Sequence, residues 1–230
     1  MNQNKNLYIC IKFKRMTTSE ENYLKVIYHL SVVSPKGVNT NAIAGMLETK
    51  ASSVTDMLKK LSEKDLVIYK KYQGASLTEN GTLTAKMIVR KHRLWEVFLV
   101  EKLNFTWDEV HEIAEELEHI QSEKLIDKLD AFLNFPDFDP HGDPIPNANG
   151  EIKKVQKQLL SDAKINVSYK CVGVKDSSAE FLQYLDKQKI ALGSTFKILE
   201  KDTFDDILQV EINDKKITIS DKIATNLYVQ

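Results

Sequence analysis

The chain has 230 residues, 42% of them hydrophobic, and no stretch of its sequence approaches the roughly 20 apolar residues of a membrane-spanning helix. Its two cysteines, Cys10 and Cys171, lie far apart, which argues against a disulfide framework and predicts a reducing, cytoplasmic setting. The net charge of −1 hides an asymmetry, because residues 1–92 carry 15 basic against 7 acidic side chains, whereas residues 93–151 carry 4 against 15. A basic front can neutralise phosphates, and an acidic middle can hold cations.

Residues 1–15 show no helical or strand pattern and are interpreted as an N-terminal tail ahead of an alternative start at Met16. A helix is predicted next, with Thr18 as its cap and Glu21 as the capping-box partner, because apolar residues then recur at helical spacing. Pro35-Lys36-Gly37 ends this helix.

Two short helices, at about 40–47 and 51–64, follow and are joined by a tight turn, which is typical of a helix-turn-helix. Residues 66–78, with a turn at Gln73-Gly74, read as a β-hairpin. A helix-turn-helix followed directly by a hairpin is a winged helix, so we predict a winged helix-turn-helix DNA-binding domain at residues 16–78. Winged helices also mediate protein contacts, which is the alternative.

The predicted DNA contacts lie at the front of the second helix of this motif and in the hairpin. The N-terminal part of such a helix enters the major groove, where lysines and short hydroxyls reach phosphates and base edges. The predicted set is Lys50, Ser52, Ser53, Thr55, Asp56, Lys59, Lys60, Lys70, Lys71 and Tyr72. Asp56 has the wrong sign for a phosphate contact, so it must accept from a cytosine amine or point away from the backbone.

Helical patterns at about 79–102, 107–118 and 122–134 predict a helical domain at residues 79–150, which ends in a proline-rich loop at residues 134–150. After a short helix predicted at 152–160, β-branched runs and one helix at 178–187 predict a small β-barrel-like domain at residues 158–230. The fold class is therefore mainly α with a small β domain.

Histidines and glutamates share faces on two of these helices. His92 and Glu96 are i,i+4 neighbours, and His111, Glu115, Glu118 and His119 form one stripe at i, i+4, i+7 and i+8. A solvated surface is the alternative for either set alone, but two sets on consecutive helices in the acidic third of the chain favour a metal site. Oxygen-rich ligands with imidazole favour Mn(II) or Fe(II), and with no cysteine nearby in the sequence a Cys-rich zinc site is excluded.

The sequence resembles the metal-dependent repressors of the diphtheria toxin repressor and manganese transport regulator family. The segments that carry the resemblance are EENYLKVIYHL (20–30), ASSVTDMLKKLSEKDLV (51–67), LTENG (77–81), RKHRLWEVFL (90–99), VHEIAEELEHI (110–120) and DPHGDPIP (139–146). The C-terminal part, with LDKQKIALGSTFKIL and ATNLYV, resembles the SH3-like (FeoA-like) domain of longer members.

The resemblance implies a homodimer that binds palindromic operator DNA when Mn(II) or Fe(II) is bound. The positions that match the family's primary site are Asn22, Glu115, Glu118 and His119. Iron-type members carry cysteine where this chain has Glu115, so the match favours manganese. Asn22 departs from the methionine of iron-type and the aspartate of manganese-type members. Lys25 replaces a glutamate that short manganese regulators use in a paired-metal site, so that arrangement is not expected.

The ancillary site of the family matches His92, Glu96 and His111, and Asp176 or Glu180 are the candidate ligands from the C-terminal domain. The expected function is that of a cytoplasmic, dimeric, non-enzymatic repressor of metal-homeostasis genes without a membrane partner. One alternative is a winged-helix protein-interaction module with a structural metal. The other is a metal-dependent hydrolase, which lacks an obvious base outside the ligand set.

Overall fold

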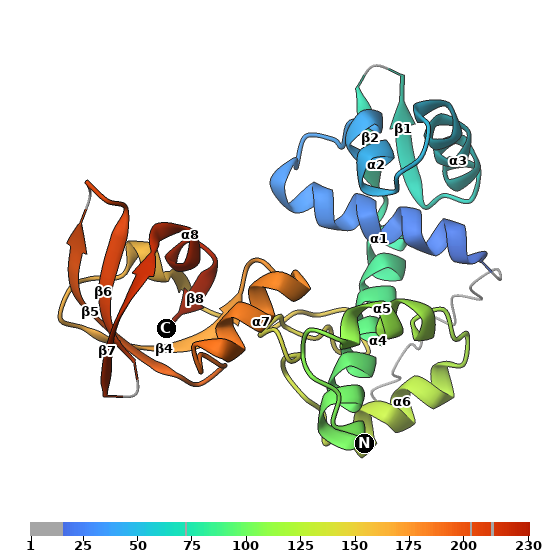
Figure 1. Ribbon diagram of the computed structural model, residues 1–230. Coiled ribbons are helices and arrows are strands. Elements are labelled where there is room, and N and C mark those ends of the chain that lie inside the picture. The colour runs from blue at the N-terminus through green and yellow to red at the C-terminus, as the bar shows by residue number, and fades with distance from the viewer. Residues whose placement is uncertain (1–15, 72, 203, 213) are drawn as a thin grey trace, which may run out of the picture. The chain divides into compact units, whose positions relative to one another are not determined.

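The computed structural model describes residues 16–71, 73–202, 204–212 and 214–230. They divide into two compact units, one ending at Ala85 and one running from Lys86 to Gln230, and the boundary falls within helix α4 (Glu79–Leu103; Figure 1). The predicted tail, residues 1–15, and the predicted DNA contact Tyr72 lie outside the described residues. None of the described helices is long and apolar enough to cross a membrane.

The first unit has the helix-turn-helix and hairpin that the sequence predicts. Its elements are α1 (Thr18–Val33), α2 (Thr40–Met46), α3 (Ala51–Glu63), β1 (Val67–Lys70) and β2 (Gly74–Leu77), followed by the start of α4. One face of α3 is fully buried through Val54, Leu58 and Leu61. Strands β1 and β2 are antiparallel, and an isolated bridge from Val38 to Ala75 attaches the segment before α2 to this hairpin.

The cap of α1 lies one residue earlier than predicted. Thr17, not Thr18, is the N-cap: its Oγ1 accepts from the Glu20 N–H at 3.3 Å, and the Thr17 N–H donates to Glu20 Oε2 at 3.0 Å. Adjacent threonines and adjacent glutamates give two capping boxes of equal spacing. The side chain that becomes buried, Glu20, accepts at Oε1 from Lys64 Nζ at 2.6 Å and pairs with Lys60 Nζ at 3.1 Å.

The second unit begins with the helical part that positions the site. The remainder of α4, helix α5 (Val110–Leu117) and helix α6 (Glu123–Phe132) are followed by the proline-rich loop. Helices α4 and α6 share a core that consists of Leu94, Val97, Ile126, Leu129, Leu133 and Ile145. Ile145 brings the proline-rich loop into this core, which holds the loop near α4.

The rest of the second unit is the small β domain. Its elements are β3 (Gln158–Leu159), the 3-10 turn η1 (Leu160–Asp162), β4 (Ser168–Val174), α7 (Ala179–Lys187), β5 (Thr195–Asp202), β6 (Ile207–Ile212), β7 (Lys215–Ser220), α8 (Asp221–Ala224) and β8 (Leu227–Val229). The strand order is β3-β8-β4-β5-β6-β7, so the pairings among the described residues form an open sheet and not a closed barrel. The helix predicted at 152–160 is wrong: this segment is extended and pairs Gln158 with Val229.

The proline-rich loop is fastened to the β domain by its backbone. The Val174 N–H donates to the His141 carbonyl oxygen at 2.9 Å, and Gly142, at φ +84°, lies where a Cβ would collide with the Val172 carbonyl. The segment before α5 is tied to α7, because Trp107 Nε1 donates to Asp186 Oδ2 at 3.1 Å. The loop therefore lies between helix α4 and strand β4, and this places His141 within reach of both.

Candidate metal centre

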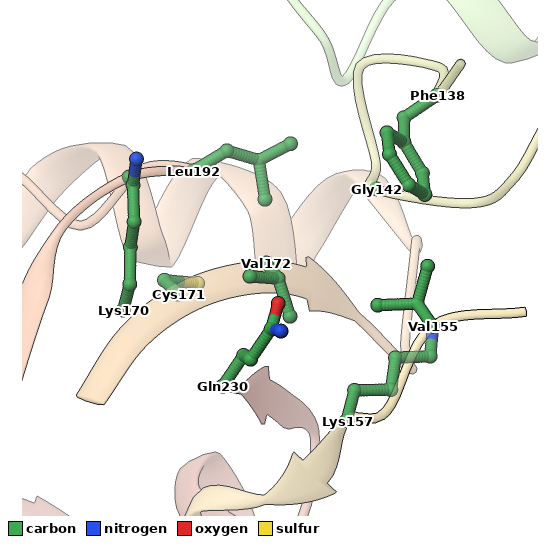
Figure 2. Close-up of a pocket in the computed structure, with 10 residues that line it drawn as sticks. Phe138, Gly142, Val155, Lys157, Lys170, Cys171, Val172, Leu192 and Gln230 are labelled. Carbon is green, nitrogen blue, oxygen red and sulfur yellow. The ribbon is translucent and has the colours of Figure 1, made fainter.

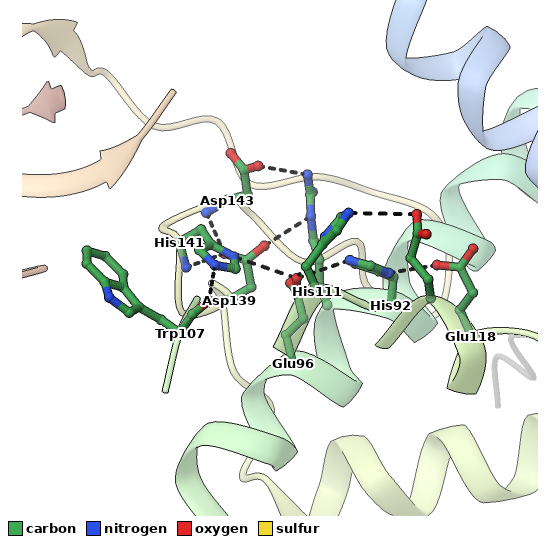
Figure 3. Close-up of polar contacts among 10 residues, drawn as sticks. His92, Glu96, Trp107, His111, Glu118, Asp139, His141 and Asp143 are labelled. Atoms are coloured by element: carbon green, nitrogen blue, oxygen red, sulfur yellow. Dashed lines mark hydrogen bonds and ion pairs between the residues drawn. The ribbon is translucent and has the colours of Figure 1, made fainter. Parts of the chain in front are cut away.

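Helices α4 and α5 bring the predicted ancillary ligands together (Figure 3). His92 Nε2 lies 3.1 Å from Glu96 Oε1, and His111 Nδ1 lies 3.6 Å from the same oxygen. One ligand atom from each of the three lies within 4.8 Å of the others. His92 and Glu96 are buried, whereas the His111 side chain is 53% exposed, so the set opens to solvent on one side.

These separations fit a divalent cation. Two ligand atoms at about 2.1 Å from one ion lie about 3.0 Å apart at a right angle and about 3.4 Å apart at a tetrahedral angle. The three side chains supply imidazole nitrogens and a carboxylate, a hard to borderline donor set. The other end of His92 is also held: Nδ1 lies 2.7 Å from Glu118 Oε2, an orienting contact of the kind that fixes the tautomer of a ligating histidine.

The predicted primary ligands are divided between the two units. In the second unit, Glu118 is fully buried, His119 Nε2 lies 3.9 Å from Glu118 Oε1, and Glu115 Oε1 lies 3.7 Å from His111 Nε2. In the first unit, the side-chain oxygen of Asn22 on α1 is buried and accepts no hydrogen bond from any described residue. A buried oxygen in that state is costly unless it finds a donor or an ion.

A second set of candidate ligands was missed in the sequence. Glu96, Asp139 and His141 also each offer an atom within 4.8 Å of the others, and all three are buried. His141 Nδ1 lies 3.6 Å from Glu96 Oε1. The signal was Asp139-Pro-His141 within DPHGDPIP, which the helical-face argument could not use because these residues lie in a loop.

Burial and charge set the protonation of this cluster. Burial opposes the ionisation of Glu96, but hydrogen bonds with His111, His141 and His92 outweigh it and hold its pKa well below the ordinary range. Burial, reinforced by the charge of Glu96 and opposed by Arg93, raises the pKa of Asp139 to about 7. For His141, burial acts downward, but the hydrogen bond with Glu96 leaves its pKa raised. A second buried negative charge beside Glu96 is thus unfavourable without a cation.

The candidate ligands from the β domain do not join either set. Asp176 Oδ1 accepts from the Ser178 N–H at 2.9 Å at the start of α7, and Glu180 is exposed on the first turn of that helix. Within the described parts of the chain, the two sets above are the groups of three or more ligand-type side chains close enough to hold an ion.

The predicted DNA-contacting residues lie on one motif of the first unit. Lys50 is the exposed N-cap of α3, and Ser52, Ser53 and Asp56 are exposed along the helix. Two of the lysines have acidic partners: Lys59 Nζ is 3.3 Å from Asp56 Oδ1, and Lys60 pairs with the buried Glu20. Thr55 Oγ1 donates to the Ala51 carbonyl at 3.0 Å, and Lys70 and Lys71 are exposed at the hairpin.

A cavity of about 360 Å³ lies beside β4, at the proline-rich loop (Figure 2). Its lining is mostly apolar and includes Phe138, Val155, Val172 and Leu192, with Lys157 and Lys170 at its sides. The one described cysteine, Cys171, also lines it and is buried, which raises the pKa of its thiol to about 11. None of the predicted metal ligands lines this cavity.

A winged helix-turn-helix combined with a buried His/Glu cluster defines a DNA-binding regulator with a divalent-metal site. The iron-dependent repressor N-terminal DNA-binding domain matches residues 15–75, the iron-dependent repressor metal-binding and dimerisation domain matches 78–147, and the FeoA domain matches 158–230. The chain belongs to the iron-dependent repressor family of diphtheria toxin repressor type, and it is a metal-dependent transcriptional repressor, not an enzyme.

Individual relatives agree with this assignment. The chain is 34% identical over 152 residues to the HTH-type transcriptional regulator MntR of Oceanobacillus iheyensis, covering 65% of this chain and 95% of the relative. It is 32% identical over 131 residues to the iron-dependent repressor IdeR of Mycobacterium tuberculosis, covering 57% and 56%. An 86-residue stretch is 45% identical to a protein of Chlamydia trachomatis named "Probable metal transport system membrane protein", of which the chain spans only 19%.

A solved structure named as a manganese-dependent transcriptional repressor in complex with manganese is similar over 91% of this chain and 98% of that one. Its TM-score is 0.81 and its sequence identity is 33%. A structure of ScaR with bound Zn²⁺ has a TM-score of 0.72 and 34% identity, over 92% and 98%. Relatives with manganese and iron in their names occur at similar identity, so divalent-metal binding is shared.

Proposed function

We propose that this chain is a cytoplasmic, manganese-responsive repressor that binds palindromic operator DNA as a homodimer and controls genes of metal-ion homeostasis. Fe(II) is the alternative metal. The observation that carries the proposal is the buried contact of His92 and Glu96, completed by His111, within a chain that has a winged helix. Its donors are nitrogen and oxygen, and the one described thiol, Cys171, is buried at the cavity beside β4.

Glu115 supports manganese over iron. The resemblance places it where iron-type members carry a cysteine, and carboxylate oxygen suits Mn(II) better than thiolate does. Its side chain lies on α5, with Oε1 3.7 Å from His111 Nε2. Glu118 and His119 follow at the C-terminal end of the same helix.

The proposal assigns the ligand residues to two metal sites. When bound, a divalent ion supplies positive charge that draws carboxylates and imidazoles together. Glu115, Glu118 and His119 bind at the primary site with Asn22 from α1, and His92, Glu96 and His111 bind at the ancillary site. Because the primary ligands come from both units, the ligand set can favour one arrangement of the DNA-binding domains, and a differential affinity of about 1–3 kcal/mol per linked site is typical of such coupling.

The test compares metals on one DNA sequence. A duplex is selected from a random library with the full-length chain and Mn(II), and its binding is then measured by fluorescence anisotropy with Mn(II), anaerobic Fe(II), Zn(II) or chelator. We expect strong binding with Mn(II), weaker activation by Fe(II), and none with chelator. Binding that is the same with chelator, or that depends weakly on salt, would instead favour a protein-interaction module with a structural ion.

A further inference from the structure

We infer that the cavity beside β4 is a binding site for a small organic anion with an apolar body, a carboxylic acid that carries a medium-length alkyl chain or an aromatic ring. This site goes beyond the proposed function and is independent of the metal, because none of the predicted metal ligands lines the cavity. Three features of the cavity support it: its size, its apolar walls and the charge of the lysines beside it.

The cavity is too large to be a packing defect. Its volume is about 360 Å³, whereas well-packed interiors hold few voids larger than a water molecule. At about 30 Å³ for each water molecule, the space equals about a dozen waters, or one organic molecule with about a dozen non-hydrogen atoms. Ligand pockets in proteins begin at about 300 Å³, so the cavity has the size of a small-molecule site.

The apolar walls come from separate segments of the second unit. Phe138 belongs to the proline-rich loop, Val155 to the extended segment before β3, Val172 to β4 and Leu192 to the turn before β5. All four side chains are half-buried, so each leaves part of its apolar surface accessible. A molecule with an apolar body would cover this surface, which is favourable in proportion to the apolar area removed from water.

Among the described lining residues, the charged side chains are both lysines. Figure 2 shows Lys157 and Lys170 on opposite sides of Val172. The Lys157 side chain is only 23% exposed, and its Nζ lies 3.9 Å from the centroid of the Tyr228 ring. The carboxylate oxygen Asp143 Oδ1 lies 3.7 Å from this Nζ, which is beyond hydrogen-bonding distance. An ammonium group carries three donors, so Lys157 can bind an anion without leaving these neighbours.

The thiol in the wall does not oppose an anion. Cys171 lines the cavity, but burial raises the pKa of its thiol to about 11, so the thiol is neutral near pH 7. The same shift leaves little thiolate to react with a ligand, so binding is noncovalent. A neutral, apolar wall with a partly buried lysine selects an anion over a neutral or cationic molecule of the same shape.

Decanoate is the probe, because it has about a dozen non-hydrogen atoms and ends in a carboxylate. Decanol and decyltrimethylammonium carry the same chain with a neutral or a positive head, so they separate charge from apolar binding. Isothermal titration calorimetry on the full-length chain measures the three affinities, and methyl NMR spectra locate the site through Val155, Val172 and Leu192. We expect decanoate to bind about tenfold more tightly than either analogue and to shift the methyl signals of these three residues.

The lysines are tested by removing their charge. Lys157→Met has a side chain of similar length and should weaken decanoate binding about tenfold, the effect of losing a hydrogen bond to a charged group, while decanol binding stays within about twofold. Lys170→Met should have a smaller effect of about twofold, because Lys170 is exposed. Lys164→Met is the matched control, since Lys164 is an exposed lysine of the same domain outside the cavity lining.

The location is tested by filling the cavity. Leu192→Trp should prevent the binding of both decanoate and decanol, because the larger side chain occupies the space. Val155→Trp makes the same test from another wall if Leu192→Trp does not fold, as judged by circular dichroism. Val167→Trp is the matched control, since Val167 is exposed in the same domain and does not line the cavity.

Three results would overturn the site. Equal binding of decanoate and either analogue would show that the cavity does not select an anion. No decanoate binding at concentrations up to about 1 mM would show that the cavity takes no such ligand. Decanoate binding that is unchanged in both tryptophan variants would place the ligand elsewhere on the chain. None of these measurements uses metal or DNA, so failure of the site would leave the proposed function standing.

Discussion

Each unit buries a glutamate on a helix, and the two carboxylates have different surroundings. Glu20 on α1 is fully buried, but Lys60 of α3 and Lys64, the C-cap of α3, lie at 3.1 and 2.6 Å from its Oε1. Glu96 on α4 is also buried and has imidazole nitrogens around the corresponding oxygen. A lysine is a permanent cation and completes the first site from within the chain, whereas a neutral imidazole offers a lone pair and leaves room for an ion. Burial alone therefore does not identify a metal ligand; the charge of its neighbours does.

The largest effect that this comparison predicts is at the second unit's ligands. Glu118→Ala and His119→Ala should each weaken metal-activated operator binding by more than about 100-fold, the upper end of the loss typical when a group that merely supports a ligand is removed. Each supplies a bond that the other ligands cannot replace. Fluorescence anisotropy with and without Mn(II) measures the effect, and circular dichroism checks the fold.

Glu116→Ala is the control for these variants, because Glu116 is an exposed neighbour on α5 outside both ligand sets. If both ligand variants still bind the operator in a metal-dependent way, the primary site has been assigned to the wrong residues.

The next effect concerns Glu20, which should contribute stability that is independent of metal. Burial opposes its ionisation, but Lys64, the Thr17 N–H and Lys60 lower the pKa from 4.5 to about 2. Glu20→Gln should reduce the free energy of unfolding by about 2 kcal/mol at pH 7, since it breaks a buried pair whose lysines are partly exposed. The free energy of unfolding is measured by denaturant titration in the presence of chelator, with hydrogen exchange of the α1 amides as the probe.

The sign of the pH dependence follows from the lowered pKa. The contribution of Glu20 is fully present above its unfolded value of 4.5 and is lost as the pH falls from there through its folded pKa of about 2. The stability difference between wild type and Glu20→Gln should therefore shrink between roughly pH 5 and roughly pH 2. The exposed Glu63→Gln on α3 is the control; a difference that grows on acidification, or that vanishes with Mn(II), contradicts this role.

Helical periodicity explains how much of these sites could be predicted. His92 and Glu96 were found because i,i+4 residues share a face, and the structure brings their atoms to 3.1 Å. Asp139 and His141 were not found, because a loop has no sequence periodicity that would predict which of its side chains lie together.

Local propensity also misled at two positions. Residues 152–160 are rich in lysine, glutamine and leucine, which favour helix, yet pairing with β8 and the position of Lys157 Nζ 3.9 Å over the Tyr228 ring hold the segment extended. At α1 the repeated Thr-Thr and Glu-Glu pairs fit two capping registers, and only the structure, with Glu20 against the α3 lysines, distinguishes them.

A smaller effect is expected at Asn22, where a substitution to aspartate would add a charged ligand like those of the second unit. Asn22→Asp should strengthen Mn(II) binding by about tenfold, or about 1.4 kcal/mol, because a charged oxygen replaces a neutral one. Its oxygen is buried without a donor among the described residues, so the variant should also be less stable without metal. Calorimetric titration with Mn(II) at a pH where histidines are neutral separates affinity from stability.

The control for this variant is Asn41→Asp, which adds the same charge at an exposed position of α2 in the same unit. Equal Mn(II) affinities of Asn22→Asp and wild type would show that residue 22 is not a ligand, and another side chain or water would then have to complete the primary site.

The smallest effects are expected on the DNA-binding surface, at two exposed lysines. Lys50 is exposed at the start of α3 and Lys71 is exposed at the hairpin, whereas Lys60 is already paired with Glu20. Lys50→Ala and Lys71→Ala should each reduce the slope of log K against log salt by about one unit, because each variant neutralises one phosphate fewer. Lys60→Ala should leave that slope nearly unchanged and should instead lower the stability of the first unit. Anisotropy titrations across a salt series, at saturating Mn(II), measure all three. Slopes that are unchanged in both Lys50→Ala and Lys71→Ala would mean that α3 and the hairpin do not touch the DNA backbone. A reduced slope in Lys60→Ala would mean that Lys60 leaves Glu20 and contacts a phosphate when DNA is bound.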